Sequence, residues 1–166
     1  MSADNQQERL GNYIAGYTDG EGSFHIAIQK SPKLKFGYQL LPEFHISQST
    51  DRILVIKLIK DLWKCGYIKA NFKGHDNNMV LVVRNRQDLL NIVIPFFRKY
   101  PILSEKQKDF EKFSFIVEEM QKGHHLGKRY FIKMVKLAFS MNGSGKYRKF
   151  NVTDIINSLE SSETTR

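Results

Sequence analysis

The spacing of apolar residues changes along this chain and divides it into helices and strands. In residues 6–17 apolar side chains recur every three or four positions, which is typical of one face of a helix. From Phe24 the spacing becomes two, with Phe24, Ile26 and Ile28 on one face of a predicted strand. Residues 38–47 resume the alternation after a break, so the two segments predict a long antiparallel hairpin.

From Asp51 the chain repeats the order of one helix followed by two strands. A helix is predicted from Asp51 to about Trp63, and a hairpin of residues 66–72 and 79–84 follows it. Residues 87–99 predict another apolar helix, bent or ended at Pro95. Helix, two strands, helix, two strands and helix together predict an α+β domain of αββαββα order, with helices on one face of an antiparallel sheet. Ser49, Thr50 or Asp51 is expected to cap the second helix, whose apolar side holds Ile53, Leu54, Ile56, Leu58, Ile59 and Leu62.

The other face of the sheet is expected to be open and polar. Polar side chains on such a face can form hydrogen bonds with base edges in the DNA major groove, although any solvated sheet face is polar too. The strand pattern alone therefore leaves both interpretations open. The predicted DNA-binding residues are those on this face together with the lysines of the first hairpin connection and of the second hairpin. They are His25, Gln29, Lys30, Lys33, Lys35, Gln39, Glu43, His45, Lys69, Asn71, Lys73 and Asn78.

The charge balance favours a polyanionic partner. The 166 residues hold 26 Lys and Arg against 17 Asp and Glu, a formal charge of +9. Nucleic acid is the first interpretation, and an acidic membrane surface is the second. The longest uncharged apolar run, residues 89–97, is far shorter than the roughly 20 residues that span a bilayer. No signal-peptide pattern is seen in residues 1–7, so we expect an intracellular protein with no membrane partner. Its one cysteine, Cys65, excludes an intramolecular disulfide and a cysteine-rich zinc site.

Residues 13–24, YIAGYTDGEGSF, contain two features that are unfavourable in a helix: closely spaced glycines and acidic residues near the C-terminus. Gly20 and Gly22 are expected to end the helix in the left-handed conformation. Asp19 and Glu21 lie where the helix C-terminus carries partial negative charge, which makes each carboxylate unfavourable by about 0.3 to 1 kcal/mol. A divalent cation is the simplest partner, because carboxylate and carbonyl oxygens form the hard site that Mg²⁺ prefers.

Small residues in this helix leave one face bare. Ala15, Gly16 and Gly20 stand where a helix facing a core normally carries large apolar side chains. The bare face would let another backbone approach closely. A surface helix of poor propensity would show the same residues, so both interpretations stand.

The segment from Ile14 to Gly22 resembles the LAGLIDADG motif of homing endonucleases. It matches the motif at the alanine, both framing glycines and both acids, and Ser23 and Phe24 lead into a strand. Glutamate as the second acid is a variant that the family also uses. The resemblance covers about residues 10–142 of a single domain, 1–166, whose residues 143–166 form a basic link and a short helix. It implies a saddle-shaped sheet that enters the DNA major groove.

The resemblance also implies roles for individual residues. Glu21 and the Gly20 carbonyl would hold Mg²⁺ or Mn²⁺ at the scissile phosphate. Gln48, Arg52 and Lys106 match positions where the family carries polar or basic residues that arrange water and phosphate around the metal. The helix would pack against its symmetry mate through Tyr13, Ala15, Gly16, Asp19 and Gly20.

We therefore expect a homodimeric, intron-encoded homing endonuclease that hydrolyses both strands of a long, pseudo-palindromic double-stranded DNA target, without a small-molecule cofactor. A non-cleaving nucleic-acid-binding protein of the same fold, such as an intron RNA maturase or a DNA-binding regulator, is the alternative. A regulatory domain on acidic membranes has only the net charge in its favour. A bacterial or archaeal cytoplasm, a mitochondrion or a chloroplast fits equally. His124 and His125, which lack a third ligand nearby in sequence, are expected to be loop residues.

Overall fold

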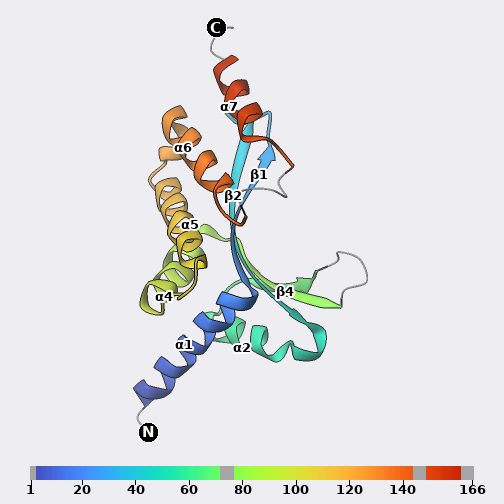
Figure 1. The fold of residues 1–166 in the computed structure, drawn as a ribbon, viewed down its shortest axis with the longest axis vertical. Coiled ribbons are helices and arrows are strands. Elements are labelled where there is room, and N and C mark those ends of the chain that lie inside the picture. The colour runs from blue at the N-terminus through green and yellow to red at the C-terminus, as the bar shows by residue number, and fades with distance from the viewer. Residues whose placement is uncertain (1–2, 72–76, 144–148, 162–166) are drawn as a thin grey trace.

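The chain forms one four-stranded antiparallel sheet with a layer of helices against it (Figure 1). The structure, a computed structural model, describes residues 3–71, 77–143 and 149–161. The predicted αββαββα order is confirmed, and further helices follow it. The elements are α1 (Ala3–Glu21), β1 (Gly22–Lys30), β2 (Tyr38–Ser49), η1 (Thr50–Arg52), α2 (Leu54–Trp63), β3 (Tyr67–Ala70), β4 (Asn78–Val83), α3 (Arg86–Asp88), η2 (Leu89–Val93), α4 (Ile94–Lys99), α5 (Lys106–Gln121), η3 (His124–Leu126), α6 (Lys128–Phe139) and α7 (Val152–Ser161).

The strand order in the sheet is β1-β2-β4-β3. Both predicted hairpins form, and the long strand β2 joins them by pairing with β1 on one side and β4 on the other. Phe24 lies opposite Phe44, and both side chains face the helices, as the alternation predicts. His25 lies opposite Glu43 on the other face.

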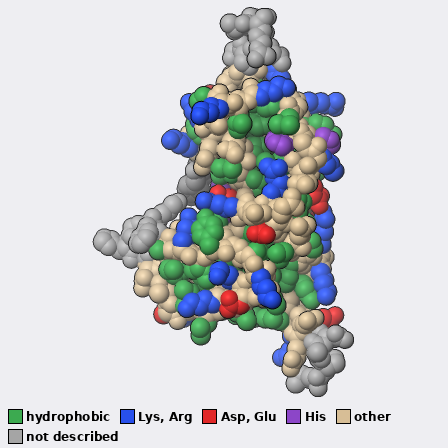
Figure 2. Space-filling view, turned by 180° about the vertical axis from the view of Figure 1, so that it is seen from behind, with side chains coloured by type: hydrophobic (Ala, Val, Ile, Leu, Met, Phe, Trp, Pro, Cys, Tyr) green, Lys and Arg blue, Asp and Glu red, His purple; other side chains and the backbone are tan. Residues whose placement is uncertain are grey.

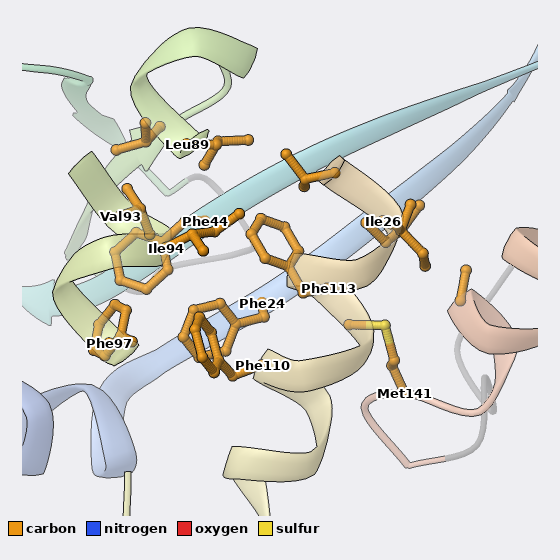
Figure 3. Close-up of a cluster of buried hydrophobic side chains, with 14 of the residues drawn as sticks. Phe24, Ile26, Phe44, Leu89, Val93, Ile94, Phe97, Phe110, Phe113 and Met141 are labelled. Carbon is orange, nitrogen blue, oxygen red and sulfur yellow. The ribbon is translucent and has the colours of Figure 1, made fainter. Parts of the chain in front are cut away.

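The core lies between the sheet and the helices, and it contains a cluster of aromatic rings among aliphatic side chains (Figure 3). Phe24 is fully buried, and its ring centroid lies 5.2 Å from those of Phe44, Phe97 and Phe110 and 5.4 Å from that of Phe113. Such ring pairs contribute about 0.5 to 1.5 kcal/mol each beyond their buried area. Because Phe24 stands two residues after the start of β1, this cluster anchors the strand directly beyond α1.

Helix α1 does not end as its glycines predict. It continues through Gly20 to Glu21, and β1 begins at Gly22 without a loop. Neither glycine takes the left-handed conformation, so that expectation is wrong. Gly22 is required for another reason: a Cβ there would lie 2.7 Å from the Thr18 carbonyl oxygen and 2.4 Å from Thr18 Cγ2. Only glycine lets the strand start this close to the last turn of the helix.

Two other helices differ from expectation. A 3₁₀ turn, η1, precedes α2, and neither η1 nor α2 has a side-chain cap. Pro95 does not end its helix, since α3, η2 and α4 follow one another without a gap. The five residues before α4 form a π-helix, and Pro95 is the second residue of α4.

The C-terminal helix α7 covers the core at the end of the molecule opposite α1 (Figure 1). Its Ile155 and Leu159 are buried in the core cluster. The predicted flexible link falls in residues 143–149, of which 144–148 lie outside the described part. No helix in the described residues combines the length and apolar character needed to cross a membrane.

Candidate functional site

The end of α1 is held by a lysine from the other half of the chain. Lys106 Nζ donates to the carbonyl oxygens of Thr18 at 3.0 Å, Asp19 at 2.5 Å and Gly22 at 2.7 Å. An ammonium group has three N–H bonds, so these contacts use all of them. Lys106 therefore caps the helix C-terminus and fixes the backbone on both sides of Glu21.

This contact explains how two acids can stand at a helix C-terminus. The positive charge of Lys106 lies against the carbonyls whose partial negative charge makes Asp19 and Glu21 unfavourable there. Burial lowers the pKa of Lys106, while the charges of Asp19, Glu21 and Asp109 raise it, and the net shift is downward. Ser104, just before α5, donates to the Asp19 carboxylate. The Glu21 side chain remains exposed to solvent.

Gln48 and Arg52 approach the same helix from the end of β2 and from η1. Gln48 Nε2 donates to the Tyr17 hydroxyl at 2.5 Å. Burial raises the pKa of Tyr17, the hydrogen bond from Gln48 lowers it, and the charges of Glu21 and Arg52 act on it with opposite sign. Of the residues assigned to the reaction, Lys106 thus contacts the end of α1 that carries Glu21, and Gln48 and Arg52 lie near Tyr17, one turn earlier.

Oxygen donors for a metal are present but few. Lys106 takes the carbonyls of Thr18, Asp19 and Gly22 and not that of Gly20, the residue directly before the exposed Glu21. In the described part of the chain, no three His, Cys, Asp or Glu residues gather as a metal site. The donor set therefore fits a hard cation that takes its other ligands from water and substrate.

The exposed face of α1 carries the small residues, with one correction. A Cβ at Gly16 or Gly20 would meet nothing within 4 Å, and Tyr13 beside them is 50% exposed. Packing in this chain therefore does not require these two glycines. Ala15 is only 4% exposed and packs inside its own chain, so its assignment to a bare face is wrong. Asp19 is half-buried and bound by Ser104, as described above.

The open face of the sheet is polar along β1, β2 and β3. Gln29, Gln39 and Lys69 are exposed there, and His25, His45, Asn71 and Asn78 are half-buried. Strand β4 differs, because Val80 and Val82, which pair with Ser47 and His45 on this face, are buried. The predicted polar face is therefore divided by an apolar strip along β4.

Glu43 is buried on this face, against expectation. It is 6% exposed, and its carboxylate oxygens lie 2.7 Å from Arg84 Nε and 2.9 Å from His45 Nε2. Burial raises the pKa of Glu43, but the hydrogen bonds and charges of His45 and Arg84 outweigh it and lower the pKa below its ordinary value. Glu43 therefore holds the side chains of His45 and Arg84 in place.

The lysines of the first hairpin connection stand at its exposed tip. Lys33 and Lys35 are exposed, Lys35 Nζ donates to the Leu126 carbonyl at 3.3 Å, and Lys30 lies over the Phe150 ring. Lys73 and most of the second hairpin turn lie outside the described residues. Figure 2 shows Lys and Arg side chains spread over the face turned to the viewer.

Three site residues were missed from the sequence. Arg84 falls in the strand alternation of residues 79–84, which could have placed it on the open face. Ser104 directly precedes the segment that holds Lys106, but nothing local marks it as a partner of Asp19. Tyr17 belongs to the apolar spacing of residues 6–17, and nothing in the sequence marks its hydroxyl as a hydrogen-bond partner. His124, by contrast, lies in a 3₁₀ turn, with Nδ1 2.6 Å from Glu119 Oε2.

Comparisons with known proteins show which proteins this chain is similar to in sequence and fold. The chain is 32% identical over 116 residues to DNA endonuclease I-CeuI of Chlamydomonas moewusii, which covers 68% of this chain and 53% of that protein. It thus spans about half the length of that relative. The archaeal intron-encoded homing endonuclease I-Vdi141I, solved in complex with DNA, superposes with a TM-score of 0.84 at 27% identity, over 95% of this chain and 99% of the other.

A second solved structure, the homing endonuclease I-TnaI, gives a TM-score of 0.76 at 34% identity, over 91% of this chain and 96% of the other. The profile of the LAGLIDADG endonucleases matches residues 14–117, which begin within α1 and end within α5, so they include Glu21, Gln48, Arg52 and Lys106. The chain therefore belongs to the LAGLIDADG endonuclease family.

Proposed function

We propose that this protein is a site-specific DNA endonuclease that hydrolyses both strands of a long, pseudo-palindromic target with a divalent metal. One observation carries the proposal: the exposed carboxylate of Glu21 stands on backbone that Lys106 fixes at three carbonyls, and Gln48 and Arg52 lie near Tyr17, one turn earlier on the same helix. A cleavage site needs this kind of preorganised carboxylate, because misplacement by even 1 Å is costly for catalysis.

The cation is proposed to be Mg²⁺ or Mn²⁺, held by the Glu21 carboxylate and the Gly20 carbonyl. Such an ion keeps several waters and takes phosphate oxygens as ligands, which suits a site where the chain supplies only two donors. When bound, it would activate a water and stabilise the leaving oxygen. The side chains of this protein would then orient water and phosphate around it.

Each supporting residue receives a role from its position. Gln48, half-buried at the end of β2, would orient a water or a phosphate oxygen beside Glu21. Arg52 is exposed and would contact the phosphate backbone. Lys106 already has three carbonyl partners, so we propose that it acts by positioning the end of α1, and not by contacting phosphate directly.

The open sheet face is the proposed site of sequence readout. Gln29, Gln39 and Lys69 are exposed on it, and the ion pairs of Glu43 orient His45 and Arg84. I-Vdi141I, which shares this fold, is a protein solved with DNA bound. The lysines at the tip of the first hairpin would bind phosphates without regard to sequence.

Cleavage of two strands requires a second copy of the site, and we propose a homodimer. Gly16 and Gly20 leave open space on α1 that none of the described residues fills, and a two-fold contact is self-complementary by construction. A second apolar surface supports this assignment. At the end of the molecule where α1 lies, α2 exposes Leu54, Leu58 and Leu62, spaced four residues apart, at 75%, 45% and 48% (Figure 1).

Intron encoding, proposed from the named relatives, would put the gene in an organelle or in a bacterial or archaeal genome. A non-cleaving protein of the same fold would need no preorganised carboxylate, and this favours the nuclease.

The test is selection of cleaved sites from a randomised double-stranded DNA library with Mg²⁺, followed by sequencing of the cut ends. The proposal expects one long motif of two matching half-sites with cuts at fixed positions in both strands. A library bound by the protein but left uncut with Mg²⁺ or Mn²⁺ would favour the non-cleaving alternative. The Glu21→Gln variant serves as the control for contaminating nucleases.

A further inference from the structure

The amide of Gln48 is fixed at both of its ends. Its Oε1 accepts a hydrogen bond from the backbone N–H of Ser49 at 2.8 Å. Because that partner can only donate, the oxygen of the amide must face it and the nitrogen must face Tyr17. Gln48 Nε2 accordingly donates to the Tyr17 hydroxyl oxygen at 2.5 Å.

The Tyr17 hydroxyl links α1 to the Gln48 side chain at the end of β2. Tyr17 is half-buried on α1, one turn before Glu21, and lies within electrostatic range of both Glu21 and Arg52. Its ring stacks on that of Tyr13, with centroids 6.2 Å apart and an angle of 28° between planes. The ring is therefore held by a neighbour on its own helix while its hydroxyl reaches the sheet.

This arrangement leaves one Gln48 proton with a defined direction. An amide nitrogen has two N–H bonds, and the contact with Tyr17 uses one. The second is available to a water or a phosphate oxygen, and it can point in only one way while the first is held. Without the hydroxyl, the Ser49 N–H alone would hold the amide, and the orientation about its terminal bond, which has broad preferences, would be less restricted.

We infer that Tyr17 is a positioning residue of the cleavage site, whose hydroxyl fixes the Gln48 amide beside Glu21. This inference rests on the proposed nuclease function. It assigns to a residue of the motif helix a role in the reaction in addition to packing. Tyr17 does not touch the reacting atoms, so its effect on cleavage must pass through Gln48.

The test is a double-mutant cycle on cleavage rates at saturating DNA. Tyr17→Phe removes the hydroxyl and keeps the ring, and should slow cleavage about fivefold to tenfold, as removal of one hydrogen bond does, without weakening DNA binding. In a Gln48→Ala background the same change should have no further effect. Tyr100→Phe, whose ring packs against α1 at Gly11, is the matched control and should cut normally. Equal slowing by Tyr17→Phe in both backgrounds would overturn the inference.

A second measurement reads the contact without cleavage. In protein labelled with ¹³C at tyrosine Cζ, NMR titration of wild-type and Gln48→Ala protein reports the pKa of Tyr17, identified by its loss in Tyr17→Phe. The hydrogen bond from Gln48 lowers this pKa, so Gln48→Ala should raise it. An unchanged Tyr17 titration would overturn the inference even if the enzyme cuts. Failure of wild-type protein to cut any target, with the titration shift present, would instead overturn the proposed function.

Discussion

Lys106 Nζ lies 2.7 Å from the carbonyl oxygen of Gly22, a contact that ties the first residue of α5 to the first residue of β1. The carboxylate of Glu21 stands one residue before Gly22, so its direction depends on this bond. A lysine that serves the site through the backbone behaves differently from one that binds phosphate, and mutation can separate the two roles.

Lys106→Ala should slow cleavage far more than it weakens DNA binding. It should also lower the free energy of unfolding by about 1 to 2 kcal/mol, because a partly buried cation is removed from a helix C-terminus. Cleavage rates, DNA affinity and urea unfolding measure the three effects. Lys108→Ala, two residues on and exposed, is the control. Equal losses in cleavage and affinity with unchanged stability would place Lys106 on the DNA backbone instead.

Glu21→Gln should abolish cleavage and leave DNA binding nearly intact, because it removes a charge while preserving the shape of the side chain. Gel-shift affinity and single-turnover cleavage with Mg²⁺ measure the two properties. Glu8→Gln, an exposed change earlier on the same helix, should cut at the wild-type rate. Full cutting by Glu21→Gln would remove this residue from the reaction.

Substitution of Gln39, His45 or Lys69 should change which bases are preferred. Removing one well-formed hydrogen-bonded pairing with a base lowers discrimination by about 1 to 3 kcal/mol. Binding selections on randomised half-sites measure the preference at each position. The same preferences in all three variants would show that this face does not read the sequence.

Lys30, Lys33 and Lys35 should behave in the opposite way. Alanine at any of them should weaken binding to all sequences alike, and it should reduce the slope of log affinity against log salt by about 0.9 for each phosphate that is no longer neutralised. Affinities for specific and random DNA across a salt series make the comparison. A weakening confined to the specific site would assign the lysine to base readout.

Gly16→Leu should separate the two chains and abolish double-strand cutting without unfolding the protein. A Cβ at this position would meet no described atom within 4 Å, and replacing a helix glycine removes a cost of about 1 kcal/mol. Analytical ultracentrifugation and circular dichroism report assembly and folding. Lys136→Leu adds the same side chain to an exposed position of α6 and should remain dimeric. Sedimentation of wild-type protein as a monomer, both free and on cleavable DNA, would defeat the model.

Glu43→Gln should flatten the loss of stability in acid. Because the folded pKa of Glu43 is lower than its ordinary value of 4.5, its contribution is complete above about pH 4.5 and is lost as pH falls through the folded pKa. Urea unfolding of wild-type and variant protein between pH 7 and pH 3 should therefore converge at low pH. Parallel curves would show that the buried carboxylate is not held by Arg84 and His45.

Local pattern predicted the elements because burial repeats with the period of each element. Phe24, Ile26 and Phe44 fall on the core face as their alternation requires, and the acids and glycines of α1 identified the motif. Pattern failed for Ala15 and for Leu54. Helix periodicity shows which apolar side chains share one side of a helix. It does not show whether the rest of the same chain covers that side.

Contacts between distant residues were not readable from the sequence. Glu43 follows the alternation of an open face, yet Arg84 and His45 close over it. Lys106 was assigned by resemblance alone, and only the fold shows that it binds carbonyls of α1. These contacts depend on tertiary geometry, which periodicity and propensity do not encode.

The span of chain between the end of α1 and Lys106 has a consequence during synthesis. The bonds that fix Glu21 join residues 84 to 88 positions apart. A ribosome adds about 5 to 20 residues each second, so the nascent chain carries its complete motif for several seconds before Lys106 is added. Truncated products that stop before α5 would contain the whole motif but lack Lys106. Sequence searches that score the motif alone would therefore count inactive fragments as nucleases.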